Sequence, residues 1–161
     1  MVWWLFTDAS VDTDFSGTTF VACVIRKNKV YVANIGDSRM ILGKKKSDSK
    51  YEPVEVTDDH KPDRPDEQKR IEQRGGRVFA IEYEDGVDGP PRVWLGHMDI
   101  PGLAMARSLG DTVAHTAGVI SDPECHIVDL AKDHKVSYQQ SITLSSPLSF
   151  IYLIIAGDGA C

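Results

Sequence analysis

Two neighbouring runs of β-branched and aromatic residues, TTFVACVI at 18–25 and VYVANI at 30–35, decide the fold of this chain. Residues of these types favour strands, and the short polar connection RKNK between the runs predicts a β-hairpin. Gly36 interrupts the second run, and a third strand is expected over Met40–Leu42. An antiparallel sheet is therefore the first element that the sequence predicts.

Strand patterns recur along the rest of the chain. The clearest is FIYLIIA at 150–156, whose apolar character predicts a strand buried on both faces. Further strands are expected at residues 52–56 (an edge strand), 77–81, 92–95 and 125–130. Loops are expected at the charged residues 44–50, the turn-forming residues 84–91 and the polar, Ser/Gln-rich residues 138–149, the last as an insertion or loop.

One helix is predicted by clear start and stop signals. Pro65 suits a first helical turn, Asp66 places negative charge near the N-terminus, and a glycine pair at 75–76 ends the helix. The sequence between these signals is nearly all polar, with Ile71 as the strong apolar anchor, so this helix is expected on the surface. Residues 103–109 also have helical spacing. The predicted class is α+β with antiparallel sheets.

Composition narrows the function classes. A formal net charge of −6 argues against nucleic-acid binding, because contacts to a phosphate backbone need a basic surface. The cysteines Cys23, Cys125 and Cys161 are odd in number and form no CxxC pair, which indicates a reduced, intracellular protein. No signal peptide and no bilayer-spanning apolar stretch is evident, so we expect a cytoplasmic or nuclear protein without membrane association.

Two aspartates follow expected strands. Asp37 lies in ANIGDSR at 33–39, and Asp158 lies in AGDG at 156–159. An acid at the end of a strand is rigidly held, and neighbouring glycines let other groups approach its carboxylate closely. Hard cations such as Mg²⁺ and Mn²⁺ prefer these oxygen ligands. The residues alone leave two interpretations open: metal ligands, or turn aspartates that cap their own backbone.

Seven short motifs follow one another along nearly the whole chain. They are SGTT (16–19), ANIGDSR (33–39), TDDHKP (57–62), the pattern E…RI…GGRV (67–78), GLAMARSLGD (102–111), PE (123–124) and IIAGDG (154–159). In this order and spacing they resemble the protein phosphatase 2C family of metal-dependent serine/threonine phosphatases. Residues 82–101 look like the flap that members of this family place beside the active site.

The resemblance implies a fold and an activity. The fold is two antiparallel sheets stacked face to face and flanked by helices, and the activity is hydrolysis of phosphoserine and phosphothreonine in proteins with two Mg²⁺ or Mn²⁺ ions. By the same resemblance, Asp158 is expected to bind the metal centre and Asp37 an additional, weaker metal. Asp111 is interpreted as structural, with a metal role as the alternative. His60 and Arg107 are interpreted as supporting or packing residues.

The match to the family is incomplete. The family carries an Asp-Gly-His-Gly motif, which holds a bridging aspartate and a proton-donating histidine, and an upstream arginine that grips phosphate; none of these is found in this sequence. We therefore expect residues 1–15 to be an atypical N-terminal segment and 16–161 to be a partial domain that also lacks the family's C-terminal end.

Three hypotheses remain open for such a chain. It is part of an active phosphatase, a phosphatase-like interaction module without turnover, or a truncated product without independent function. Phosphorylated proteins are the expected partners and a monomer is the expected state. The chain as given is expected to be catalytically inactive, with no catalytic residue of its own assigned.

Overall fold

The predicted hairpin is the centre of the first sheet. The computed structural model describes residues 12–47, 50–83, 86–130, 134–139 and 150–155. Strands β2 (Phe20–Arg26) and β3 (Lys29–Ile35) pair antiparallel, as expected from the sequence. Lys27 turns the chain between them with a positive φ of 55°.

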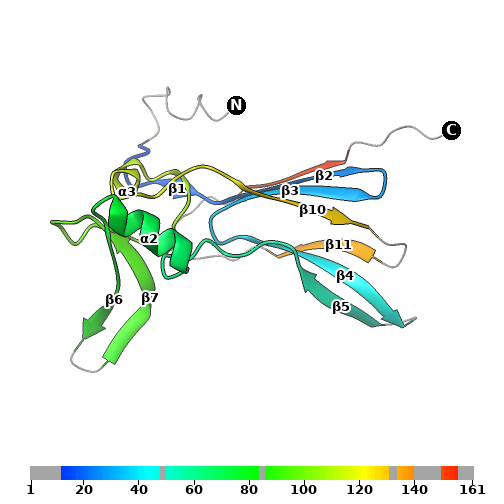
Figure 1. Ribbon diagram of the computed structural model, residues 1–161, viewed down its shortest axis with the longest axis horizontal. Coiled ribbons are helices and arrows are strands. Elements are labelled where there is room, and N and C mark those ends of the chain that lie inside the picture. Colours follow the sequence, from blue (N-terminus) through cyan, green and yellow to red (C-terminus); the bar gives the residue numbers. More distant parts are fainter. Residues whose placement is uncertain (1–11, 48–49, 84–85, 131–133, 140–149, 156–161) are drawn as a thin grey trace.

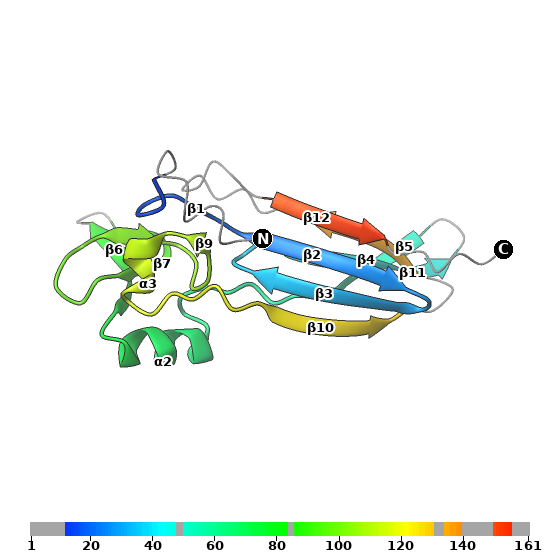
Figure 2. The same cartoon turned by 90° about the horizontal axis from the view of Figure 1, so that it is seen from above.

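Two more strands extend this sheet on either side of the hairpin. Strand β10 (Glu124–Asp129) pairs antiparallel with β3, and β12 (Phe150–Ile155) pairs with β2. Both confirm strands that the sequence predicts. The pairing of β12 with β2 is parallel, whereas the other pairs of described strands are antiparallel. Figure 2 shows the resulting order β10-β3-β2-β12.

A second sheet stacks against the first (Figure 1). It has the order β11-β4-β5 and contains β4 (Arg39–Ser47), β5 (Lys50–Glu55) and β11 (His134–Gln139). One cluster of buried side chains joins the two sheets: Val21, Cys23, Val30, Val32, Met40 and Leu42. These side chains come from β2 and β3 in one sheet and from β4 in the other, so the predicted partial antiparallel β-sandwich and the α+β class are confirmed.

Some expected loops are strands. Strand β4 continues to Ser47 and β5 begins at Lys50, so most of the charged stretch 44–50 is a β-hairpin and the loop prediction there was wrong. Backbone pairing between β4 and β5 holds this hairpin, and its charged residues Lys44, Lys46 and Lys50 are exposed at the surface. Strand β11 also takes Tyr138 and Gln139 from the expected loop 138–149, and residues 140–149 lie outside the described residues.

The region that resembles a flap forms a third sheet, β6-β7-β8. It contains β6 (Arg77–Tyr83), β7 (Gly86–Trp94) and β8 (Pro101–Leu103), and Figure 1 shows the β6–β7 hairpin projecting away from the sandwich. The loop predicted at 84–91 was therefore wrong from Gly86 onward. A register shift between Phe79 and Ile81 accommodates the prolines of β7, because a bulge leaves their missing N–H groups outside the ladder.

The helix expected at 103–109 is also absent. This segment ends β8, bends, and enters β9 (Leu109–Gly110), which pairs with β1 (Gly17–Thr18). Its backbone hydrogen bonds go to distant segments: the Ala106 N–H donates to the His60 carbonyl at 2.7 Å. The apolar side chains from Leu103 to Ala106 are all buried. The spacing of apolar residues that predicts a helix here therefore arises because an extended segment is buried on several sides.

The predicted helix is confirmed as α2 (Pro65–Gln73), and a short helix α3 (Thr112–His115) lies near it (Figure 1). Ile71 is fully buried, although most of α2 faces solvent. It is the anchor of a second buried cluster: Ile71, Val93, Leu95, Leu103, Met105, Ala106, Ala114, Ala117 and Val119. This cluster holds α2, α3 and the third sheet together at one end of the sandwich.

Replacing Ile71 by alanine should unfold this end first. Ile71→Ala removes three buried carbons from a site with no exposed surface, and large-to-small changes of this kind cost about 2–5 kcal/mol of unfolding free energy. The matched control is Ile127→Ala, because the Ile127 side chain on β10 is 64% exposed and should change stability little. Urea denaturation of the two variants measures the difference, and equal midpoints would contradict the packing described.

Candidate functional site

Asp37 lies in the bend that follows β3, where its side chain is only 1% exposed. The motif around it, GDSR at 36–39, is held by the separate segment 57–61, which runs past it in the opposite direction, from the contact of Met40 with Thr57 to that of Gly36 with His60. Gly36 and His60 exchange two hydrogen bonds: the His60 N–H donates to the Gly36 carbonyl at 3.1 Å, and the Gly36 N–H donates to His60 Nδ1 at 3.0 Å. This contact fixes the backbone immediately before Asp37.

The other residues of the motif are fixed in the same way. Arg39 donates through Nε and Nη2 to the two carboxylate oxygens of Asp59, each at 3.0 Å, and through Nη1 to Glu55 at 2.8 Å. Bidentate pairs of this kind define both position and orientation. The Ser38 and Thr19 hydroxyls lie 2.7 Å apart. Asp37 therefore lies in a segment that is held by contacts of Gly36 before it and of Ser38 and Arg39 after it.

The Asp37 carboxylate has a cation beside it. Lys61 Nζ lies 2.5 Å from Asp37 Oδ2, and the lysine side chain is 34% exposed. The sequence points to Asp37 but not to Lys61, although Lys61 belongs to the TDDHKP motif. The local sequence gives no sign of the pairing, because the two residues meet only when the two motifs dock.

Metal ligation needs more than this one carboxylate. Among the residues that the structure describes, no group of three or more His, Cys, Asp or Glu side chains is placed to hold a metal ion. Asp158, the other expected ligand, lies outside the described residues. Two hard cations need several charged oxygen ligands, so the described part does not by itself fit a two-metal centre.

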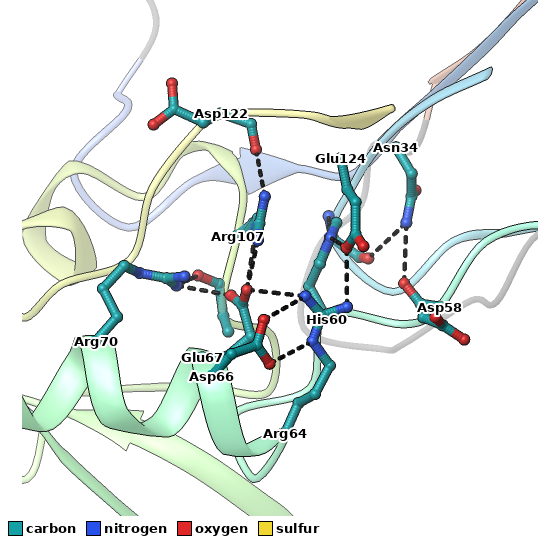
Figure 3. A network of polar contacts seen from close by, with 12 residues as sticks. Asn34, Asp58, His60, Arg64, Asp66, Glu67, Arg70, Arg107, Asp122 and Glu124 are labelled. Atoms are coloured by element: carbon teal, nitrogen blue, oxygen red, sulfur yellow. Dashed lines mark hydrogen bonds and ion pairs between the residues drawn. The ribbon is translucent and has the colours of Figure 1, made fainter. Parts of the chain in front are cut away.

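A second polar cluster surrounds the buried carboxylate of Glu67 on α2 (Figure 3). Arg107 approaches it at 2.6 Å, Arg70 at 2.7 Å and Arg64 at 3.3 Å. Burial raises the pKa of the Glu67 carboxyl, but the hydrogen bonds from Arg70 and Arg107 outweigh this effect and hold the pKa below its ordinary value. Glu67 is therefore ionised inside the fold.

His60 connects this cluster to the GDSR motif. His60 Nε2 lies 3.0 Å from Glu124 Oε2, which also accepts from Arg64 Nη1 at 2.9 Å. Burial, followed by the positive charge of Arg107, lowers the His60 pKa and keeps the ring neutral. Because Nδ1 accepts from the Gly36 N–H, we assign the proton to Nε2, which donates to Glu124. The supporting role expected of His60 and Arg107 agrees with these contacts.

Asp111 has a different setting from Asp37. It is buried, with a positive φ of 49°, and its N–H donates to the Ser16 carbonyl at 2.9 Å. Its carboxylate lies so close to Gly17 that a Cβ at this glycine would stand 1.9 Å from Oδ2. Burial raises the pKa of the Asp111 carboxyl, with Ser108 and His115 offsetting this only in part. These contacts join β1 to β9 and favour the structural interpretation.

The β6–β7 hairpin carries an exposed aromatic surface of its own. Phe79 stacks on Trp94 with ring centroids 5.1 Å apart, and the Trp94 indole N–H donates to the Phe79 carbonyl at 2.9 Å. An open pocket adjoins this pair, lined by Phe79, Ala80, Ile81, Glu82, Trp94 and Asp99.

The described helices include none that is long and apolar enough to cross a membrane.

Neutralising Glu67 should destabilise the chain more than any change on the exposed face of α2. Glu67→Gln leaves the partly buried Arg70 and Arg107 without their common anion, and loss of one partner of a buried pair costs about 3–5 kcal/mol. Glu72→Gln, on the exposed face of the same helix, is the matched control.

The pH dependence of stability gives a second measure of the Glu67 site. A carboxyl with a lowered pKa stabilises the fold above its ordinary pKa of 4.5, and this contribution is lost as the pH falls through the lowered value. Urea unfolding between pH 3 and pH 7 should therefore show a smaller pH-dependent loss in Glu67→Gln than in the wild type. Parallel pH profiles for the two proteins would contradict the assignment.

The comparisons with known proteins agree on one family. The family description "Protein phosphatase 2C" matches residues 4–137. Probable protein phosphatase 2C 72 of Arabidopsis thaliana is 43% identical over 145 residues, which cover 90% of this chain and 38% of that protein. Probable protein phosphatase 2C 14 of Oryza sativa subsp. japonica is 46% identical over 115 residues, which cover 71% of this chain and 22% of that protein.

A solved structure agrees with the sequence comparisons. The crystal structure of serine-threonine phosphatase 2C from Toxoplasma gondii superposes with a TM-score of 0.55 at 25% identity, covering 68% of this chain and 36% of that one. The chain thus spans less than half the length of each of these three proteins. By its sequence match and its fold, the chain belongs to the protein phosphatase 2C family.

Proposed function

We propose that this chain is part of a metal-dependent phosphatase that hydrolyses phosphoserine and phosphothreonine in proteins. The observation that carries the proposal is the family match over residues 4–137. It is supported by the docking of GDSR onto TDDHKP, which holds an acid rigidly at the end of a buried strand. Rigid support of this kind is what a metal-dependent hydrolytic site requires of its scaffold.

Asp158 and Asp37 are the residues that we propose as metal ligands, with Mg²⁺ or Mn²⁺ as the ion. Both follow strands of the first sheet, β12 and β3, in glycine-containing motifs. Bound divalent ions of this type supply an activated water and charge neutralisation for phosphoryl transfer. The contribution of the described residues is to fix the position of Asp37 through Gly36, His60 and Arg39.

The chain on its own is proposed to be catalytically incomplete. The sequence contains no Asp-Gly-His-Gly motif, and the described residues offer too few carboxylates for two ions. For residues 1–161 we therefore propose an incomplete domain, with 1–15 as a separate N-terminal segment and 16–161 as the phosphatase-like part.

A non-catalytic interaction module is the alternative that one specific observation favours. The open pocket beside Phe79 and Trp94 combines an aromatic surface with the carboxylates of Glu82 and Asp99. Phe79 is 37% exposed, and exposed aromatic side chains are frequent at protein–protein contacts. In this alternative the chain binds a partner through the β6–β7 hairpin without turnover.

The remaining features of the proposal concern partners and location. Phosphorylated proteins are the proposed partners. We propose that the chain does not bind nucleic acids, because its formal net charge is −6 and a phosphate backbone needs a basic surface. A monomer in the cytoplasm or nucleus, without membrane association, is proposed from the sequence composition.

Phosphate release measures the incompleteness directly. With a phosphoserine peptide and excess Mn²⁺, residues 1–161 should release no more phosphate than the Asp158→Ala variant, because the bridging acid and the proton donor of the family motif are missing. Robust turnover that Asp158→Ala abolishes would show that the chain is a working enzyme. The adjoining transcript sequence separates the hypotheses further: an in-frame Asp-Gly-His-Gly motif upstream would support membership in an active phosphatase.

A further inference from the structure

We propose that Asp111 is a proton-binding site that sets how tightly residues 13–18 are held against the segment 109–113. The contacts between these two segments are called the N-terminal joint below. When the Asp111 carboxyl carries a proton, the joint is closed, and when the carboxyl is ionised, the joint is weakened. The connection between residues 13–18 and the rest of the fold is therefore sensitive to pH.

The N-terminal joint consists of backbone hydrogen bonds and a short strand pair. Three successive N–H groups donate to carbonyl groups of the other segment: Asp111 to Ser16 at 2.9 Å, Thr112 to Thr13 at 2.9 Å and Val113 to Asp14 at 3.2 Å. Strand β1 continues the contact by pairing with β9. Directly after β1, the Thr19 hydroxyl lies 2.7 Å from that of Ser38, the residue after Asp37. Loosening the joint would therefore also loosen one support of the GDSR motif.

Asp111 stands in the middle of these contacts but does not cap α3. An aspartate directly before a helix usually accepts a hydrogen bond from one of the first N–H groups of the helix. Asp111 has a positive φ of 49°, and its side chain makes no such cap hydrogen bond. The carboxylate instead faces Gly17, where an added Cβ would lie 1.9 Å from Oδ2. Its position against β1 therefore gives up the hydrogen bonding that a helix start normally supplies to a carboxylate.

The buried carboxylate has little to balance its charge. Asp111 is 6% exposed, and its Oδ2 has no hydrogen-bond partner among the described residues. The hydroxyl oxygen of Ser108, which is fully buried, is also without a hydrogen-bond partner in the described part of the chain. Taking an ionised carboxylate out of water is costly unless a cation and hydrogen bonds compensate it, whereas the protonated carboxyl carries no charge. The geometry of the joint therefore favours the protonated form of Asp111.

The charged groups around Asp111 leave this preference in place. Burial raises the pKa of the Asp111 carboxyl above its ordinary value of 3.8, and Ser108 and the charge of His115 on α3 lower it by less. Asp14, from the other side of the joint, is itself an acid and accepts from the Thr112 hydroxyl at 2.6 Å. Arg107, in the segment before Asp111, donates its guanidinium N–H groups to Glu67. The raised pKa therefore agrees with the burial and the missing partner of the carboxylate.

A raised pKa fixes the sign of the pH dependence. The stability that the Asp111 proton contributes is fully present below the ordinary pKa of 3.8 and is lost as the pH rises through the raised value. Asp111→Asn keeps the shape of the side chain and cannot ionise, and asparagine tolerates a positive φ as aspartate does. As the pH rises from about 4, the unfolding constant of this variant should fall relative to that of the wild type, by up to about tenfold per pH unit.

Urea unfolding of the full 161-residue chain between about pH 4 and pH 8 measures this ratio. Asp63→Asn is the matched control, because Asp63 is exposed and the same chemical change there should leave the ratio to the wild type constant with pH. A ratio for Asp111→Asn that also stays constant over this range would overturn the proton-binding site.

Amide hydrogen exchange, followed by nuclear magnetic resonance, shows whether the titration acts at the joint. In the wild type, the protection factors of the three amides at 111–113 should fall severalfold over the same pH range, because these N–H groups form the joint. In Asp111→Asn they should stay constant. The Ala106 amide, which donates to the His60 carbonyl, is the internal control. An equal fall at Ala106 would place the effect in the whole fold and would overturn the local joint.

His115→Gln separates Asp111 from the neighbouring histidine. Glutamine removes the titratable ring but keeps a side chain that can donate to the Ser108 carbonyl, which lies 3.2 Å from His115 Nε2. This variant should keep the pH-dependent loss of protection at 111–113. The loss should move to higher pH, because the charge of His115 lowers the pKa of Asp111. Disappearance of the pH dependence in His115→Gln, together with wild-type behaviour of Asp111→Asn, would assign the titration to His115 and overturn the inference.

Discussion

The burial of the Glu67 carboxylate is the constraint on which the described structure depends. Glu67 has no exposed side-chain surface, and its charge is compensated by Arg64 and Arg70 from its own neighbourhood and by Arg107 from a segment 40 residues away. Removing one buried partner costs far more than the pair gains on folding, so the arginines must reach Glu67 together. This requirement fixes α2 against the extended segment 103–109. It explains why that segment cannot be a helix: its backbone and Arg107 are both committed to contacts elsewhere, including the 2.7 Å bond from Ala106 to His60.

The same network determines the position of the candidate site, because its members are linked one to the next. Arg64 contacts both Glu67 and Glu124, Glu124 accepts from His60, and His60 holds Gly36. A buried histidine that must accept from a backbone N–H on one nitrogen and donate to a carboxylate on the other has only one suitable protonation state, the neutral ring. Its lowered pKa is consistent with that state. The second sheet is tied in by Met40, whose N–H donates to the Thr57 hydroxyl at 2.9 Å. The ionic cluster and the sandwich are therefore parts of one arrangement.

The parts of this arrangement that the sequence predicts are those with a local physical signal. Alternation and β-branched residues identify β2 and β3, and Pro65 with the glycines at 75–76 identifies α2. The errors arise where tertiary contacts override local preference. Residues 103–109 have the apolar spacing of a helix because several of them are buried on different sides of an extended segment. The prolines of β7 predict a loop because the bulge that accommodates them cannot be recognised from the sequence. Asp37 was recognisable from its motif. Lys61 was not, because it lies 24 residues after Asp37 and the ion pair exists only after the two motifs have docked, with Arg39 bound to Asp59.

Two of the buried acids of the described structure, Glu67 and Asp37, differ in the cations that surround them. Glu67 is surrounded by guanidinium groups, which remain charged at any physiological pH and bind carboxylates in a fixed planar geometry. Such a cluster has no reason to exchange partners. Asp37 is equally buried, and the cation beside its carboxylate is Lys61, a flexible side chain that is 34% exposed. A lysine ammonium group sits on a flexible stem and presents no planar fork, so this pair fixes the orientation of the Asp37 carboxylate less than the guanidinium groups fix that of Glu67.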